Sequence, residues 1–439
     1  MKKQVISSSA EINGTNLLEW IKLFAPIKEY LLKLDAVYNA MDEINKGTQK
    51  CDNGRPNNKI HSNLASMIVK NSTNYFMGKN VSYKFNDENM KTQLEQYLFD
   101  SRENQENKKL AKCLSEYGVA YELCGVDEYK DPYIVMLDPL TTFEVVKDDV
   151  NATQICVVSY IEYTILRTGE KRVKGWIYTK DFIYSFDGSA LTDNMTLTEE
   201  INPYKPMCPI VVYQNNSERK GDYEDVLELL NAYNRLLSNA FDDIEGILNA
   251  VFVIYNATLP EEEGKRLNKT RVLQLLGENA KAEFLSKSLD EEYISMIRKW
   301  IREDIFTITN VPDFTDEKFA GNQSGVALSY KLIGFENLRQ EKAGYFKSGL
   351  LDRIDVLLNF KNLTEKPLWL LEKDVDIQFY ANLPANLEKD KEVATLMTMG
   401  VISKETAIDN LDLVEDTKEE LKRIEAELPE VDLNDDTEE

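Results

Sequence analysis

CPIVVYQNNSERKGDYEDVLELLNAYNRLLSNAFDDIE, residues 208–245, joins two different sequence patterns. Its first part is a short run rich in β-branched residues, whereas apolar residues recur at three- and four-residue spacing from Val226 to Val251. That spacing is typical of an amphipathic helix. We therefore predict a helix over 222–256, about 50 Å long, with Asp222 as the residue that caps its start.

The sequence before this junction predicts helices and then a β-rich domain. Residues 17–44 have helical spacing with a break expected near Pro26, and residues 60–78 have it again up to Gly78. From 119 to 212, short runs rich in β-branched and aromatic residues alternate with turns. This pattern favours an antiparallel α+β arrangement over alternating β–α–β units.

The sequence after the junction predicts a small mixed region, two long helices and a helical C-terminus. Residues 258–288 contain two strand-like runs, RVLQLLG and AEFL, and residues 290–309 carry isoleucines along one helical stripe. A helix is predicted over 325–360, where three internal glycines indicate a kink or a close backbone contact. A strand at 374–380, three shorter helices and an acidic, disordered tail at 429–439 complete the chain.

The composition describes a folded, acidic protein. The chain has 439 residues, of which 43% are hydrophobic, and a formal net charge of -24 at pH 7. This length suits two or three packed units, and this charge excludes a generic affinity for phosphate backbones. No apolar run approaches the roughly 18 residues of a membrane span, and the N-terminus lacks the apolar core of a signal peptide. We therefore expect a protein that is made and kept in a cytosol.

The residue types that carry chemistry form no catalytic constellation. The five cysteines are odd in number and form no Cys-x-x-Cys pair, which argues against a disulfide framework and a zinc site. The single histidine, His61, stands beside a polar loop, where a surface or capping role is expected. No Walker A or GxGxxG motif occurs, and acidic pairs such as Asp242 and Asp243 are expected to be solvated. The sequence therefore predicts a structural protein rather than an enzyme.

NVPDFTDEKFAGNQSGVALSYKL, residues 310–332, is the stretch most similar to an active-site loop. Its GNQSG is close to a G-x-S-x-G elbow, but Ser324 stands one position late and between two helices, where the elbow needs a strand before the turn. Pro312 and the glycines instead indicate a turning, mobile loop. Two alternatives stay open: a hydrolase that uses Ser324 or an acidic pair, and a cytosolic helical scaffold or adaptor, whose heptads should run without glycine.

Four blocks of the chain, residues 55–85, 208–245, 310–354 and 376–411, together resemble a known family. They resemble the portal, or head–tail connector, proteins of tailed double-stranded DNA bacteriophages, in the branch found in long-tailed phages of Gram-positive bacteria. The first block has the family's helix, Tyr-x-x-Gly-Lys and strand, and the second has its strand, Asn pair and long helix. The resemblance covers most of the chain in the family's order.

The resemblance implies an α+β fold of portal type with a fixed order of parts. These would be N-terminal helices and a β-rich wing at 1–221, a stem helix at 222–256, a small mixed clip at 257–288, a second stem helix at 289–309, a tunnel loop at 310–324, a long kinked wing helix and returning strand at 325–384, a C-terminal helical crown at 385–428 and the tail at 429–439. The crown would face the capsid interior.

The resemblance also assigns two functional regions and the anchors within one of them. The tunnel loop would project into the bore and contact DNA through Asn310, Val311, Pro312, Asp313, Phe314, Thr315, Asp316, Glu317, Lys318, Phe319, Ala320, Gly321, Asn322, Gln323 and Ser324. Of these, Val311, Phe314 and Phe319 would anchor the loop against helices or adjacent subunits. The clip would meet the packaging terminase and the head-completion adaptor through Leu259, Glu262, Arg266, Arg271, Leu273, Leu275 and Phe284.

The function implied is a ring at one capsid vertex, through which double-stranded DNA passes during packaging and ejection. The expected partners are further copies of the chain, usually twelve in a ring and thirteen when assembled alone, the DNA, the terminase large subunit, the adaptor, and capsid and scaffolding proteins, with no membrane. The protein would lie in the virion, at the portal vertex, and in the host cytoplasm during assembly. No catalytic residue or cofactor is expected, although divalent cations would help to hold the ring.

The charge of the chain agrees with this function on independent grounds. Duplex DNA carries one negative charge about every 1.7 Å of its axis. A basic bore would hold it tightly, whereas an acidic bore repels the phosphates and keeps the duplex centred. Because such acidic copies repel one another, the ring must be held by apolar burial between subunits.

Overall fold

The chain divides into two compact units. A computed structural model describes residues 2–41, 57–85, 88–126, 132–189, 195–248, 251–256, 279, 281–285, 291–315, 330–361, 375–382, 387–409, 411, 420, 421, 423, 424 and 426. The first unit comprises Met1–Leu34, Ile68–Glu224 and Asn310–Glu439, and the second comprises Asp35–Met67 and Asp225–Thr309.

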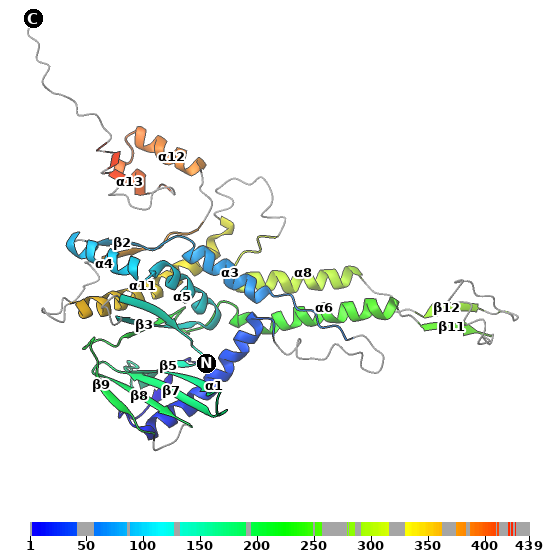
Figure 1. Cartoon of the computed structure of the whole chain (residues 1–439). Coiled ribbons are helices and arrows are strands. Elements are labelled where there is room, and N and C mark those ends of the chain that lie inside the picture. The colour runs from blue at the N-terminus through cyan, green and yellow to red at the C-terminus, as the bar shows by residue number, and fades with distance from the viewer. Residues whose placement is uncertain are drawn as a thin grey trace, which may run out of the picture. The chain divides into compact units, whose positions relative to one another are not determined.

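The first unit contains the β-rich region (Figure 1). A six-stranded sheet has the order β1-β5-β6-β7-β8-β9, in which β1 is parallel to β5 and the other pairs are antiparallel. Its strands are β1 (Val5–Ser7), β5 (Thr142–Lys147), β6 (Gln154–Thr164), β7 (Lys171–Tyr178), β8 (Phe182–Gly188) and β9 (Thr198–Ile201). An antiparallel sheet of order β10-β3-β4 contains β3 (Val119–Val126), β4 (Pro132–Leu137) and β10 (Ile210–Gln214). The antiparallel pairing predicted for residues 119–212 is confirmed.

The helices of this unit come from both ends of the chain. They are α1 (Gly14–Tyr38) and α3 (Leu64–Met77), both of which continue into the second unit, and α4 (Glu88–Asp100), α5 (Glu103–Tyr117), α11 (Ile333–Lys361), α12 (Leu387–Thr398) and α13 (Lys404–Asp409). A further antiparallel pair joins β2 (Ser82–Phe85) to β13 (Val375–Gln378), so N- and C-terminal segments are combined in one unit.

Helix α1 continues through Pro26, so the break predicted there is wrong. A proline inside a helix costs about 3 kcal/mol because it removes a backbone hydrogen bond. Apolar side chains on both sides of Pro26 are buried, including Trp20, Phe24 and Leu31, and Phe24 stacks on Phe143 of β5 with 4.4 Å between ring centroids. Burial of this stripe offsets the lost hydrogen bond.

The second unit contains a helix pair and a strand pair. A 3-10 turn η1 (Glu224–Val226) leads into α6 (Leu227–Leu248), and α6 lies beside α8 (Glu291–Ile308) (Figure 1). Between them in sequence, β11 (Val251–Tyr255) pairs antiparallel with β12 (Lys281–Leu285). The helix predicted over 290–309 and the strand predicted at AEFL are confirmed, whereas the strand predicted at RVLQLLG lies outside the described residues.

The predicted helix over 222–256 is wrong at its C-terminal end, because residues 251–255 form β11. The sequence there, VFVIY, is apolar at every position and therefore fits helical and extended spacing equally well. Its β-branched and aromatic composition favours the strand.

Two of the glycines inside α11 meet other parts of the first unit. A Cβ atom on Gly349 would overlap the ring of Tyr213 in β10, and one on Gly334 would lie 2.9 Å from Oδ1 of Asn310. Gly344 has open space around it. The close contact predicted for this helix is therefore confirmed at Gly349, where only a glycine lets α11 approach β10.

Candidate functional site

The structure describes the first six residues of the predicted tunnel loop, 310–315. Some of their side chains pack against other residues of the first unit. Asn310 has a positive φ of 54°, which asparagine tolerates, and its side chain faces Gly334. Val311 is buried, and the half-exposed Phe314 meets Phe335 of α11 edge to face, with 6.5 Å between centroids. Val311 is thus buried and Phe314 packs against α11, while the predicted role of both as anchors of the loop stays a prediction.

A hydrogen-bonded turn follows these contacts. Asp313 Oδ1 accepts hydrogen bonds from the Thr315 backbone N–H at 3.1 Å and from its hydroxyl at 2.6 Å. The remaining loop residues lie outside the described residues: Asp316, Glu317, Lys318, Phe319, Ala320, Gly321, Asn322, Gln323 and Ser324. The alternative of a nucleophilic Ser324 therefore concerns a residue outside the described ranges.

The part of α11 that contacts Phe314 is itself held in place by a cluster of aromatic and polar side chains. Phe335 stacks on Tyr75 of α3 with 4.1 Å between centroids, and the Tyr75 hydroxyl donates to Glu336 at 2.9 Å. Arg339 donates to both carboxylate oxygens of Glu336, and to the carbonyl of Phe379. Although burial acts in the opposite direction, hydrogen bonds from Arg339 and Gln340 hold the pKa of Glu336 below its ordinary value. The loop therefore begins on a rigid base.

The predicted clip is described only through its strand pair. Phe284 lies in β12, opposite Phe252 of β11, and Tyr255 is partly exposed at the end of β11. The other predicted clip residues lie outside the described residues: Leu259, Glu262, Arg266, Arg271, Leu273 and Leu275. The structure thus places one of the seven on a strand and leaves their shared role a prediction.

The first unit contains a buried ion network that the sequence pattern did not predict. Arg353 of α11 is fully buried and donates to both oxygens of Glu122 in β3, each at 2.8 Å. The same guanidinium donates to Glu103 at 3.1 Å and to Asn107 at 2.7 Å, both in α5. Tyr213 of β10 donates to Glu122 at 2.8 Å. The available signal was a glutamate inside the apolar strand VAYELCGV.

A second buried pair corrects the role predicted for Asp222. Lys342 of α11 donates to Asp222 at 2.6 Å, to Ser115 at 2.7 Å and to Ser72 at 2.9 Å. The other Asp222 oxygen accepts from Asn215 at 2.9 Å. Burial lowers the pKa of Lys342, and Asp222 opposes that change. Lys342 therefore links Asp222 to α3 and α5, and the Asp222 carboxylate is taken by Lys342 and Asn215 instead of capping a helix.

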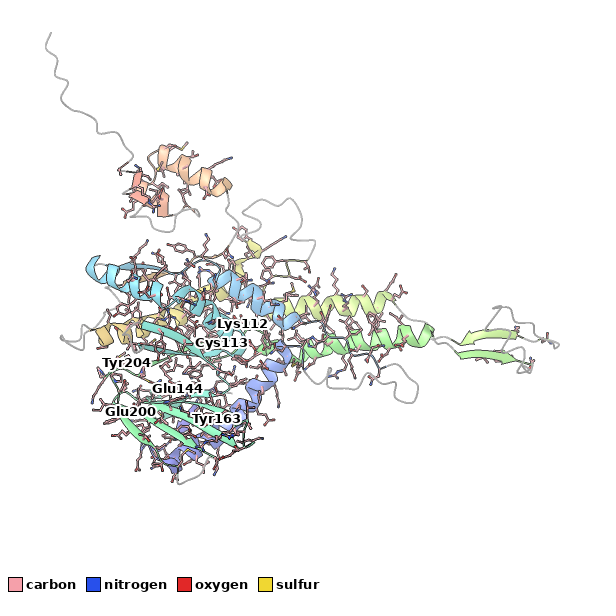
Figure 2. All side chains as sticks on the ribbon, in the orientation of Figure 1. Lys112, Cys113, Glu144, Tyr163, Glu200 and Tyr204 are labelled. Carbon is pink, nitrogen blue, oxygen red and sulfur yellow. The ribbon has the colours of Figure 1, made fainter. Side chains whose placement is uncertain are left out.

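The described cysteines have no feature of reactive thiols. Cys113 (Figure 2), Cys124, Cys156 and Cys208 are free and buried, and burial raises the pKa of each. Buried thiols with raised pKa values are poor nucleophiles.

The described ranges have two further properties that bear on function. They contain no group of three or more His, Cys, Asp or Glu side chains placed to hold a metal ion. Of the helices in those ranges, none has the length and apolarity needed to cross a lipid bilayer.

The family described as Phage portal protein, SPP1 Gp6-like, matches the chain over residues 25–432. The chain belongs to this family. The portal protein of Bacillus phage SPP1 is 22% identical over 439 residues, covering 95% of this chain and 84% of that protein. The portal protein of Clostridium phage phiCD119 (strain Clostridium difficile/United States/Govind/2006) is 24% identical over 246 residues, covering 52% of each. The resemblance to portal proteins of phages of Gram-positive bacteria is confirmed.

Solved structures give a weaker likeness. A chain of "Virion of native gene transfer agent (GTA) particle" has a TM-score of 0.46 and 11% identity, covering 86% of this chain and 91% of its own. A chain of "Neck of native GTA particle computed with C12 symmetry" has a TM-score of 0.45 and 10% identity, covering 88% and 93%. Because these TM-scores are low, the family assignment rests on the sequence matches.

Proposed function

We propose that this protein is a portal protein, which forms a ring at one capsid vertex and the channel for double-stranded DNA during packaging and ejection. The observation that carries the proposal is the family match over residues 25–432, which extends through both compact units. The protein would act in the virion at the portal vertex, after assembly in the host cytoplasm. This role requires binding and shape, and no catalytic step.

The ring would contain about twelve copies, or thirteen when the protein assembles alone. Self-repulsion between chains of net charge -24 must be overcome by apolar contacts between copies. Divalent cations, which bind carboxylate oxygens, would add to those contacts. Capsid and scaffolding proteins would surround the ring.

The bore would be acidic and would guide DNA without holding it. Binding of duplex DNA by a protein depends on cations that replace the counterions of the phosphates. A chain with 76 acidic and 52 basic side chains has few cations to offer for that exchange. DNA would therefore pass through without a deep energy minimum.

The tunnel loop, residues 310–324, would project into this bore from the base formed by Val311, Phe314 and Phe335. The buried position of Val311 and the edge contact of Phe314 support this arrangement, since they fix where the loop begins. Its polar residues, with Lys318 as the cation, would make a weakly adhesive surface.

The β11–β12 strand pair and the chain between its strands would form the clip, where the terminase large subunit and the head-completion adaptor dock. Helices α6 and α8 would be the stem, the two larger sheets the wing, and α12 and α13 part of the crown. The strand composition of β11 supports a clip that begins nearer to α6 than the sequence pattern predicted.

DNA packaging tests the proposal. Procapsids made with this chain should protect DNA from nuclease after packaging, and procapsids made without it should protect none. Ser324→Ala should package as the wild type does. Loss of packaging by Ser324→Ala, with rings still formed, would support the catalytic alternative instead.

A further inference from the structure

A pocket of about 300 Å³ opens beside the buried ion network of Arg353. The chain around β2, the end of α4 and the start of α5 line it, together with Tyr380, which follows β13. All of this lining belongs to the first unit. Its volume is at the lower end of the range for ligand pockets, which suits a single side chain.

Glu103 is the buried charged residue that lines this pocket, and it is only 6% exposed. Its Oε1 accepts hydrogen bonds from the Tyr83 hydroxyl, from Asn107 at 2.6 Å and from Arg353 at 3.1 Å. Its Oε2 accepts none from the described residues, yet this oxygen is not closed off from solvent. One carboxylate oxygen is therefore saturated, and the other is open to a donor that enters the pocket.

The network behind the pocket has more negative than positive charge. Arg353 is the cation that the described residues supply to both Glu103 and Glu122. Its two shortest contacts with carboxylate oxygens, both 2.8 Å, go to Glu122. Glu103 is therefore the second carboxylate on one guanidinium. A buried carboxylate that is incompletely compensated is costly, and a cation in the pocket would reduce that cost.

The walls of the pocket favour an organic cation over a metal ion. Phe99, which is 81% exposed, and Tyr380 line it, and aromatic rings attract guanidinium and ammonium groups. A hard metal ion needs several oxygen ligands, and the described ranges hold no group of three acidic, His or Cys side chains placed for one. Glu95 adds a further acid, whereas Arg102 is exposed and is not part of the described lining.

The polar residues of the pocket suit a peptide. Asn80 and Asn104 line it and are exposed. A side-chain amide both donates and accepts hydrogen bonds, as the backbone of an extended peptide does. A free polyamine in its charged form has donors alone and would leave the amide N–H groups without an acceptor.

We propose that this pocket receives an arginine side chain from a basic segment of a partner protein. The guanidinium would donate to Oε2 of Glu103 and lie against Phe99, while the backbone of the segment would meet Asn80 and Asn104. Arginine fits better than lysine because its planar group has five N–H donors and stacks on aromatic rings.

The occupant is a different protein because a chain of net charge -24 attracts basic partners and repels its own copies. The inference does not depend on the ring, since every residue that carries it lies within one unit of one copy.

Titration with a capped peptide tests the pocket. Full-length protein in about 150 mM NaCl, where charges are screened beyond about 8 Å, is titrated with acetyl-Gly-Arg-Gly-amide and followed by saturation-transfer NMR. The matched probe is the same peptide with citrulline, which has the shape of arginine without its charge. We expect saturable binding of the arginine peptide and about 10-fold weaker binding of the citrulline peptide. Equal binding of the two would overturn the inference.

Variants of the pocket locate the binding. Phe99→Ala should weaken it about 10-fold and still fold, because the ring is exposed. Glu103→Gln should weaken it by at least as much, with urea unfolding as the check that this variant is folded. Trp300→Ser, which alters a 57% exposed aromatic residue of the second unit, is the matched control and should bind as the wild type does. Wild-type affinity in Phe99→Ala would show that net charge alone attracts the peptide, and the pocket would be rejected.

Two further measurements identify the source of the cation. Spermidine should bind more weakly than the arginine peptide, and tighter binding of spermidine would assign the pocket to a free polyamine. The peptide should bind assembled and unassembled protein equally, and loss of binding on assembly would assign the pocket to a neighbouring copy. Either contrary result would overturn the proposed partner.

Discussion

Arg353 in the first unit and Trp300 on α8 in the second unit are placed in opposite ways: the charged side chain is buried and the apolar one is exposed. In the first unit Arg353 is fully buried and all its described partners come from the same chain, whereas on α8 Trp300 is 57% exposed. Burying a charge requires a complete set of partners, and exposing a tryptophan leaves apolar area in water. Arg353 therefore has its set of partners within its own unit, whereas Trp300 leaves apolar area in water.

The strongest test of a self-contained first unit is Arg353→Leu. It should lower the free energy of unfolding by about 3–5 kcal/mol, because Glu122 and Glu103 would stay buried without their cation. Urea unfolding monitored by circular dichroism measures the change. Lys33→Ala, which removes a 70% exposed partner of Glu29, should leave the midpoint unchanged. Equal small effects for both variants would show that the Arg353 network is not essential to the unit.

A pair of glycine substitutions tests how tightly α11 packs. Gly349→Ala should destabilise the protein by about 1–3 kcal/mol, because its Cβ would overlap the Tyr213 ring. Gly344→Ala, in the same helix but with open space around it, should stabilise by about 0.5–1 kcal/mol. Thermal unfolding of both variants measures the difference. The same sign for both would contradict the close approach of α11 to β10.

Alkaline pH should weaken the first unit through its buried thiols. Burial raises the pKa of Cys208 from 9.0 to about 12. Below pH 9 both folded and unfolded states keep the thiol proton. Above it only the unfolded state loses that proton, so stability falls as pH rises, by about 1.4 kcal/mol per pH unit for one thiol. Lys342 acts in the opposite direction, since burial lowers its pKa.

Urea unfolding between pH 9 and 10.5 measures this slope. Cys208→Ala should reduce the loss of stability per pH unit by the contribution of one thiol. The other buried thiols and the buried tyrosines should still cause the rest of the loss. A slope identical to that of the wild type would contradict the assignment to Cys208.

The smallest effect on unfolding is expected for the helix pair. Trp300→Ser should change the stability of the unassembled chain by no more than about 0.5 kcal/mol, because an exposed side chain contributes little to folding. Unfolding is measured below the concentration at which the chain assembles. A loss comparable to that of Arg353→Leu would mean that Trp300 supports its own chain, and the contrast between the two regions would fail.

The sequence predicted the regular elements better than their partners. Apolar spacing located α8, and β-branched runs located the strands of the larger sheets, because each pattern follows from the side of the element that is buried. The predictions at Pro26 and at VFVIY were wrong. At Pro26 the burial of apolar side chains outweighed the helix-breaking tendency of proline, and at VFVIY pairing with β12 outweighed the helical spacing. The ion network of Arg353 and Glu122 was beyond reach, since it depends on residues 231 positions apart.

The functional regions were predicted from resemblance rather than from pattern. Nothing in the spacing of residues 310–324 or 257–288 distinguishes a DNA-facing loop or a docking site from an ordinary connection. Val311 is buried and Phe314 meets Phe335, but their role as loop anchors stays a prediction. The isoleucine stripe predicted for residues 290–309 does not include Trp300, whose exposure could not be anticipated because a sequence does not show which side chains a helix leaves in water.

Negative-stain imaging of the purified full-length protein is the most direct measurement. We predict closed rings with a central hole, of uniform subunit number, that persist when magnesium is present. Compact monomers under every salt and magnesium condition would contradict the ring and its channel.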